Sequence, residues 1–297
     1  MPYMPKTMPL VAWHPWTDVR HRNDIRTLNI SYPFGTMPTK WTLKIRQSYY
    51  AASLYIDNLI GKLLREIDPT NTIVLLTSDH GWSLGENGLW AKYSNFDVAL
   101  KVPLIFKVPG FPSKSISTPV ELIDIFPTIL ELANLNITPK CKDVHENSKN
   151  CYEGKSLVPF MKTSKYKNRR PYAISQYPRP SVYPEINSDK PHLKDIKIMG
   201  YSIRTKRYRY TEWISFNNTL FSRNWSTIYG VELYDHVTDD DESYNFHLNP
   251  KYKHVEKKLS HILRLQIDPY YNNKYLLNEV TYPIANPHRP PTTICIQ

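Results

Sequence analysis

Several common sequence features are missing from this chain of 297 residues. No run of about 20 apolar residues occurs, so we expect no segment to span a bilayer. The first residues are rich in proline and lack the apolar core of a signal peptide. Zinc-finger, helix-turn-helix and RNP patterns are also missing, which disfavours a nucleic-acid-binding module.

The composition that remains is that of a globular, loop-rich protein. Hydrophobic residues make up 41% and charged residues 22%, while 25 prolines interrupt the chain. The length allows one large domain or two smaller ones. The net charge is +11 with 10 histidines counted as neutral. This charge favours a polyanionic partner, either nucleic acid or a sulfated polysaccharide.

Cysteines and glycosylation triplets indicate a secreted type of protein. Of the three cysteines, Cys141 and Cys151 bracket a polar loop, and Cys295 lies near the end of the chain. We expect a small disulfide loop between the first two, with unpaired surface thiols as the alternative. The Asn-x-Ser/Thr acceptors begin at Asn29, Asn136, Asn217 and Asn224. We therefore expect a secreted-type protein whose first part is missing from this sequence.

Periodicity in the first 165 residues predicts alternating helices and strands. Apolar residues recur every three or four positions over 44–68, which predicts an amphipathic helix. The apolar runs 72–77 and 102–108 read as strands, the first of them buried in a parallel sheet. Thr118-Pro119-Val120-Glu121 has the pattern of a capping box that opens a helix reaching Leu132. The first 40 residues read as a loop that packs on another part of the protein.

The character of the sequence changes after about residue 165. Short aromatic-rich strand candidates follow at 172–177, 198–205, 208–213 and 231–234. Lys206 joins two of them in a predicted hairpin, and 251–267 predicts a final helix. We place the domain boundary in the lysine-rich stretch, which divides the chain into residues 1–165 and 166–297.

The strongest chemical signal is Asp79-His80-Gly81 directly after the first predicted strand. Ligands in open α/β sheets lie beyond the carboxyl ends of strands, where an aspartate can donate oxygen to a hard cation. Lys92 follows in a glycine-rich, aromatic loop and could neutralise charge on a leaving oxygen. The alternative is that Asp79 caps a turn and that Lys92 is an ordinary solvated lysine.

These residues belong to a longer resemblance. The block Thr77-Ser-Asp-His-Gly-Trp-Ser-Leu-Gly-Glu-Asn-Gly resembles the second signature of sulfatases. The run Trp90-Ala-Lys-Tyr-Ser-Asn-Phe-Asp-Val-Ala is similar to the branch of that family that acts on iduronate 2-sulfate. Further matching stretches begin at Lys44, Ser175 and Ser188, so that the resemblance covers roughly residues 10–235.

The resemblance implies a fold and a cofactor. The fold is α/β, a partial alkaline-phosphatase-like sulfatase sandwich, followed by a smaller α+β C-terminal domain with an antiparallel sheet. Asp79 and His80 match positions that bind one calcium ion. A calcium ion takes six to eight oxygen ligands, so the cage in this chain is incomplete. The Cys-x-Pro-Ser-Arg signature that carries formylglycine does not occur here, and we expect it in a missing N-terminal sulfatase segment.

The same resemblance implies a substrate and its contacts. Lys92 matches the lysine that contacts the sulfate, Trp82 would shape the sugar pocket, and Lys190 would face the uronate carboxylate. Arg179 would support that substrate wall. The implied substrate is 2-O-sulfated iduronate of heparan or dermatan sulfate, and the implied location is lysosomal or secreted. Without the formylglycine segment we expect this chain to be inactive alone.

Two alternatives stay open. A sulfatase-like protein without its nucleophile could bind glycosaminoglycan and catalyse nothing. Another member of the superfamily, a phosphodiesterase or phosphatase with two zinc ions, is disfavoured because the extra Asp and His ligands are not spaced around Asp79-His80.

Overall fold

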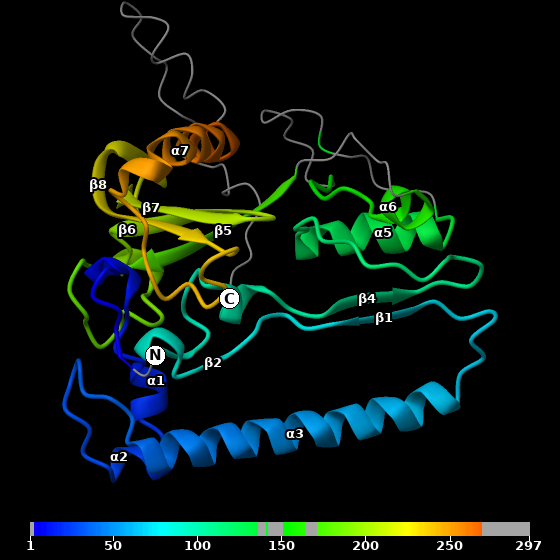
Figure 1. Ribbon diagram of the computed structural model, residues 1–297, viewed down its shortest axis with the longest axis horizontal. Helices are drawn as coiled ribbons and strands as arrows, with labels where there is room; N and C mark the ends of the chain where they lie inside the picture. Colours follow the sequence, from blue (N-terminus) through cyan, green and yellow to red (C-terminus); the bar gives the residue numbers. More distant parts are fainter. Residues whose placement is uncertain (1–2, 136–140, 142–150, 164–170, 269–297) are drawn as a thin grey trace, which may run out of the picture.

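The computed structural model describes residues 3–135, 141, 151–163 and 171–268 (Figure 1). The helical elements are η1 (Leu10–Ala12), α1 (Thr17–Arg20), α2 (Asn23–Arg26), α3 (Thr39–Arg65), η2 (Glu86–Gly88), α4 (Asp97–Leu100), η3 (Leu122–Asp124), α5 (Ile125–Leu132), α6 (Val158–Lys162), η4 (Leu193–Asp195), η5 (Pro250–Tyr252) and α7 (Lys253–Ile267). The strands are β1 (Val74–Thr77), β2 (Ser83–Leu84), β3 (Trp90–Ala91), β4 (Leu104–Lys107), β5 (Tyr172–Arg179), β6 (Ile198–Thr205), β7 (Tyr208–Asn217) and β8 (Ser222–Asp235).

The first long helix confirms the helical periodicity, although it begins five residues earlier than expected. α3 has 27 residues and runs along one edge of the molecule in Figure 1. Only Thr42 of this helix is buried, and large side chains such as Leu54 and Leu63 are about two-thirds exposed, at 64% and 65%. Most of the apolar positions that predicted the helix therefore face solvent, although Ile45 packs against the core.

The pair β1 and β4 corrects the expected sheet. Both strands form, but they are antiparallel, with Val74 opposite Lys107 and Thr77 opposite Leu104. A parallel neighbour would require a crossover connection, usually a helix. The intervening chain instead forms the short antiparallel pair β2–β3 and the single turn α4, which return the chain in the opposite direction. Neither strand is buried, so the prediction of a buried parallel strand was wrong.

The helix expected from Thr118 begins later. Glu121 and Asp124 form the reciprocal capping box, in which the Glu121 N–H donates to the Asp124 carboxylate at 2.9 Å. The single-turn η3 follows and continues directly into α5. Proximity of acidic side chains to the first free N–H groups, rather than the Thr-Pro pair, determines where the helix starts.

The best-packed part of the molecule is a four-stranded antiparallel sheet in the order β5-β6-β7-β8. The predicted hairpin around Lys206 is confirmed as the β6–β7 pair. α7 covers this sheet (Figure 1), and its Leu259, Leu263 and Ile267 are buried against it. Gly200 lies under the Trp213 ring, where an added Cβ would come within 2.7 Å of ring carbons. A side chain at this position would displace the tryptophan.

The N-terminal segment packs against the rest of the molecule, as the sequence predicted. Trp13 and Trp16 are buried in the same core as Trp90 of β3. Arg20 is almost fully buried and ties the segment together. Its guanidinium donates hydrogen bonds to five main-chain carbonyls, those of Pro15, Ile30, Ser31, Pro33 and Gly35. The segment is therefore ordered and packed against the core, and it is called the N-terminal wall below.

Three further findings bear on the sequence predictions. Cys141 and Cys151 form a disulfide. Across the described ranges, no helix combines the length and the apolar character that crossing a membrane requires. The predicted domain boundary between residues 165 and 166 lies outside the described residues.

Candidate functional site

Asp79, His80 and Lys92 come together at the end of β1. The His80 Nε2 atom lies 2.7 Å from the Lys92 Nζ atom and 3.4 Å from the Asp79 Oδ2 atom. The strand ends at Thr77, and the His80 side chain then reaches Lys92, directly after β3, while Asp79 contacts His80. The three residue types that the sequence singled out therefore form one polar cluster.

The hydrogen bonds of His80 determine its tautomer. Its Nδ1 atom lies 2.8 Å from the Gly81 carbonyl oxygen, which can only accept. Nδ1 therefore carries the proton, and the Nε2 lone pair faces Lys92. A carbonyl that fixes the opposite ring nitrogen is the usual support for a metal-binding histidine.

The Asp79 side chain is exposed at 84% and keeps its charge. Slight desolvation opposes ionisation, but nearby His80 and its main-chain N–H hold the pKa of Asp79 below the ordinary value. Oδ1 accepts this N–H at 3.0 Å, while Oδ2 points towards the imidazole. The aspartate thus caps the turn and still has oxygen available for a cation.

The kind of donor fits a bound cation, but the number of donors does not complete a calcium cage. One carboxylate and one imidazole nitrogen are present, whereas calcium takes six to eight oxygens. The cluster can form one side of such a site, and the remaining oxygens must come from elsewhere.

Trp82 lies beside this cluster. Its ring centroid is 6.3 Å from that of His80, with an angle of 35° between the ring planes. The side chain is partly buried and packs against the core that contains Trp90. This tryptophan is held by packing next to the polar cluster.

Lys190 belongs to a second polar group, which contains Asp18 and Tyr93. Its Nζ atom lies 2.8 Å from Asp18 Oδ2 and 5.8 Å from the centre of the Tyr93 ring. The Tyr93 hydroxyl also donates a hydrogen bond to Asp18 Oδ2. Tyr93 directly follows Lys92, so consecutive residues contact His80 on one hand and Asp18 and Lys190 on the other.

Asp18 and its support were missed by the sequence analysis. Asp18 lies in α1, inside the segment that was read as a loop without periodicity, and no motif marks it. His14 is buried and its Nδ1 lies 3.1 Å from Asp189 Oδ1. Burial lowers the pKa of His14, while Asp189 opposes this shift. The only available signal was that Asp189 precedes Lys190 in the matching Ser188 stretch.

Arg179, which the sequence analysis placed in support of the substrate wall, lies beneath the surface. It is 1% exposed, and its guanidinium donates to main-chain carbonyls from several segments. The acceptors are Val11, Ala12, Tyr93, Pro178 and Ser188. With its donors used and its surface covered, Arg179 cannot contact a ligand. It joins the N-terminal wall, the β3 loop and the Lys190 loop.

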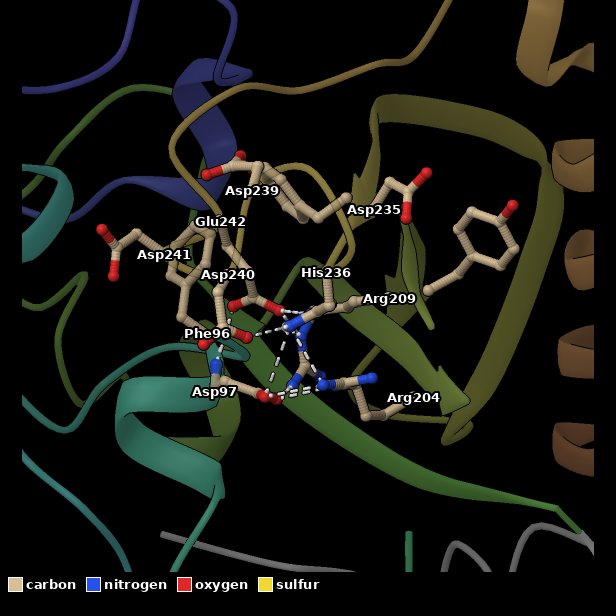
Figure 2. A network of polar contacts seen from close by, with 12 residues as sticks. Phe96, Asp97, Arg204, Arg209, Asp235, His236, Asp239, Asp240, Asp241 and Glu242 are labelled. Atoms are coloured by element: carbon tan, nitrogen blue, oxygen red, sulfur yellow. Dashed lines mark hydrogen bonds and ion pairs between the residues drawn. The ribbon is translucent and has the colours of Figure 1, made fainter. Parts of the chain in front are cut away.

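A separate charged cluster lies between α4 and the four-stranded sheet (Figure 2). Ligand atoms of Asp97, His236 and Glu242 all lie within 4.8 Å of one another, as they would around a metal ion. Two guanidinium groups already neutralise these carboxylates. Arg204 Nη2 lies 3.0 Å from Asp97 Oδ2, and Arg209 Nε lies 2.5 Å from Glu242 Oε1.

This cluster is an ion network and not a metal centre. Arg209 also pairs with Asp97, and His236 Nε2 lies 2.9 Å from Glu242 Oε1 (Figure 2). Burial opposes ionisation of Asp97, but the two arginines outweigh it and hold its pKa far below the ordinary value. A cation would meet two fixed positive charges here. The network instead fastens α4, just after the Lys92 loop, to β6 and β7.

Three of the four predicted glycosylation sites lie among the described residues. The side chains of Asn29, Asn217 and Asn224 are exposed, and the last two lie in β7 and β8 near the turn that joins these strands. Asn136 lies outside the described residues.

Comparison with known proteins defines the class. The sequence profile described as Sulfatase matches residues 16–135. The profile described as N-sulphoglucosamine sulphohydrolase, C-terminal, matches residues 85–268, which is more than half of the chain. The chain therefore belongs to the sulfatase family.

Among curated proteins, the chain is similar to iduronate 2-sulfatase. The human protein is 44% identical over 284 residues, which cover 83% of this chain and 52% of that protein. The mouse protein is 42% identical over 82% of this chain and 51% of its own length. The chain thus spans about half the length of the curated relatives it matches.

A solved structure of a 2-O GAG sulfatase matches 93% of this chain and 54% of its own, with a TM-score of 0.56 and 19% identity. This likeness supports the fold alone. The predicted class, a partial alkaline-phosphatase-like sulfatase fold with a C-terminal antiparallel sheet, is confirmed.

Proposed function

We propose that this chain forms the carboxyl-terminal half of a sulfuric ester hydrolase that removes the 2-O-sulfate from iduronate of heparan or dermatan sulfate. The observation that carries the proposal is the cluster of Asp79, His80 and Lys92 at the end of β1. The similarity to iduronate 2-sulfatases supports the substrate. In this proposal residues 1–165 belong to the catalytic domain and 166–297 to a smaller domain on the substrate side.

Each site residue has a proposed role. Asp79 and His80 would hold one calcium ion together with oxygens from another segment. The ion would supply positive charge next to the sulfate. The Lys92 ammonium, placed beside His80, stabilises negative charge that develops on the leaving oxygen. Trp82 limits the sugar pocket, and the Lys190 ammonium binds the uronate carboxylate.

The same proposal requires a partner for the uncovered faces of the molecule. Leu54 and Leu63 of α3 and Ile105 of β4 are exposed, and a sheet of two strands is marginally stable alone. A hollow of 1300 Å³ also opens between β4 and the η3–α6 region. This is larger than an ordinary ligand pocket of about 300–1,000 Å³. We propose that the remaining part of a sulfatase domain, which carries the formylglycine segment, covers these faces.

A reconstitution experiment tests this function. The isolated chain should not turn over 4-methylumbelliferyl iduronide 2-sulfate. The chain co-expressed with the amino-terminal portion of human iduronate 2-sulfatase should turn it over. In that complex Lys92→Ala should lower kcat at least about 100-fold, because one charge-stabilising group is lost. Lys257→Ala on α7 is the matched control and should leave kcat unchanged.

The outcomes are decisive in both directions. Turnover by the isolated chain would refute the need for a partner segment. A purified, assembled complex that binds calcium but shows no turnover would refute the enzyme function.

A second candidate is a glycosaminoglycan-binding protein without catalysis, which the net charge of +11 favours. Salt-sensitive binding of heparin by the isolated chain, together with an inactive complex, would support this candidate over the first.

The proposed location is lysosomal or secreted. The Cys141–Cys151 disulfide supports it, because disulfides persist in oxidising compartments. The exposed asparagines Asn29, Asn217 and Asn224 are available for glycosylation in such a compartment, and Asn136 completes the proposed set.

A further inference from the structure

The Asp18 carboxylate is shared between two groups of the proposed substrate wall. Its Oδ2 atom accepts the Tyr93 hydroxyl and lies 2.8 Å from the Lys190 ammonium. The Lys190 side chain is 60% exposed and that of Asp18 is 39% exposed. Both charged ends can therefore be reached from solvent while they remain in contact with each other.

Asp18 is held from its main chain as well as its side chain. Its N–H donates to Asp189 Oδ2 at 3.1 Å, and Asp189 is 2% exposed and anchored by His14. The consecutive residues Asp189 and Lys190 thus bind the backbone and the carboxylate of Asp18. Movement of Lys190 away from this position would break one of these paired contacts.

The contacts of Asp18 favour its charged form. Partial burial opposes ionisation, but hydrogen bonds from Lys190 and Tyr93 hold the pKa of Asp18 below its ordinary value. Burial and the neighbouring carboxylate raise the pKa of the Tyr93 hydroxyl, so Tyr93 remains a donor. Within the described part of the chain, the side-chain hydrogen bonds and ion pair found for Asp18 end on Oδ2. Its Oδ1 atom is the free acceptor.

From this geometry we propose that Asp18 determines specificity by presenting Lys190 to a uronate carboxylate while its own Oδ1 accepts a hydroxyl of the same sugar ring. This inference rests on the proposed function, because it places the uronate in that site. The Lys190 ammonium has three N–H groups, of which Asp18 takes one, and two remain for a ligand carboxylate. A ligand that offers an anion but no hydroxyl gains less binding free energy here than a uronate does, because Asp18 already neutralises the charge of Lys190.

Two alternative roles make opposite predictions. If Asp18 only competes for Lys190, its removal frees the ammonium and tightens binding of any anion. If Asp18 orients Lys190 and accepts a hydroxyl, its removal weakens the preference for a uronate. The decisive quantity is therefore the ratio of the affinities for a uronate and for the same sugar without its carboxylate, and not a single dissociation constant.

The experiment titrates the full chain with two probes, the methyl glycoside of iduronate 2-sulfate and its carboxyl-reduced counterpart, and follows amide shifts by NMR. We expect the parent protein to prefer the uronate at least about tenfold, as a charge-assisted pair allows. Lys190→Ala should abolish this preference. Asp18→Ala should reduce it to less than about threefold, and Asp18→Asn and Tyr93→Phe should shift it in the same direction.

Asp24→Ala is the matched control, because Asp24 lies six residues on in an exposed pair with Arg22 and should leave the ratio unchanged. Lys92→Ala reports the sulfate end independently and should weaken both probes alike. An unchanged or larger ratio in all three Asp18 and Tyr93 variants, with Lys92→Ala still weakening both probes, overturns the role of Asp18 alone. Failure of the parent protein to bind either probe overturns this inference, whereas the proposed function is overturned separately, by an assembled complex that binds calcium but shows no turnover.

Discussion

The two amphipathic helices α3 and α7 share a periodic apolar pattern but have different surroundings. Leu263 of α7 is 0% exposed against the four-stranded sheet, whereas Leu63 of α3 is 65% exposed. The strands differ in the same way, since β6 and β7 are buried and β1 and β4 are not. The C-terminal region contains its own covering layer, and the α3–β1–β4 region lacks one among the described residues. Periodic apolar residues thus predict that one face of a helix is covered, but they do not identify the segment that covers it.

The largest expected effect tests the ion network that joins the two regions. Arg209→Met should lower the free energy of unfolding by about 3–5 kcal/mol, because the Asp97 and Glu242 carboxylates lose their buried partner. Urea unfolding measures this change. The control Arg22→Met breaks an exposed pair with Asp24 and should cost less than about 1 kcal/mol. Equal losses in both variants would show that burial of the network does not matter.

The direct comparison of the two helices comes next. Leu263→Ala should cost roughly 2–5 kcal/mol, because it leaves a cavity between α7 and the sheet. Leu63→Ala should change the stability of the isolated chain by less than about 0.5 kcal/mol, since its side chain faces solvent. The same urea titration serves for both variants. A large loss in Leu63→Ala would mean that α3 is already covered in solution.

The smallest effect concerns Glu232, which lies buried in β8. Burial raises the pKa of Glu232 to about 7, against hydrogen bonds from Trp213 and Tyr234 that favour the charged form. The folded state therefore binds a proton that the unfolded state releases above about pH 4.5. Its contribution to stability is complete below that pH and is lost as the pH rises to about 7.

Glu232→Gln removes this titration. The difference in unfolding free energy between the parent protein and the variant should change by roughly 2–3 kcal/mol between pH 4.5 and 7. Thermal unfolding at several pH values measures it. The variant comparison cancels the opposite contribution of buried His14, whose pKa is lowered by burial. Parallel pH curves for the two proteins would contradict the raised pKa.

Local patterns predicted much of the fold. The helix over 44–68 and the hairpin around Lys206 are present, because side-chain spacing and turn residues act over short distances. The direction of β1 relative to β4 was mispredicted, since an apolar run carries no information on strand polarity. The start of α5 was also mispredicted, because acidic residues nearer the helix compete with the Thr-Pro pair for the free N–H groups.

The site divides in a similar way. Asp79, His80 and Lys92 were found because their spacing after a strand has a chemical meaning, and the structure brings them together. Asp18 could not be found, because it lies more than 170 residues from Lys190 and in no recognisable pattern. The resemblance implied that Arg179 supports the substrate wall, but its burial and its main-chain acceptors could not be predicted from the neighbouring residues.

The sequence alone indicated the long helices α3 and α7, the β6–β7 hairpin and the residues of the polar cluster after β1, because these depend on spacing along the chain. Only the tertiary structure decided that β1 and β4 are antiparallel, that Arg179 is enclosed by carbonyls, and that Asp18 meets Lys190. These outcomes depend on contacts between distant segments. Such contacts arise from packing, and local spacing does not encode them.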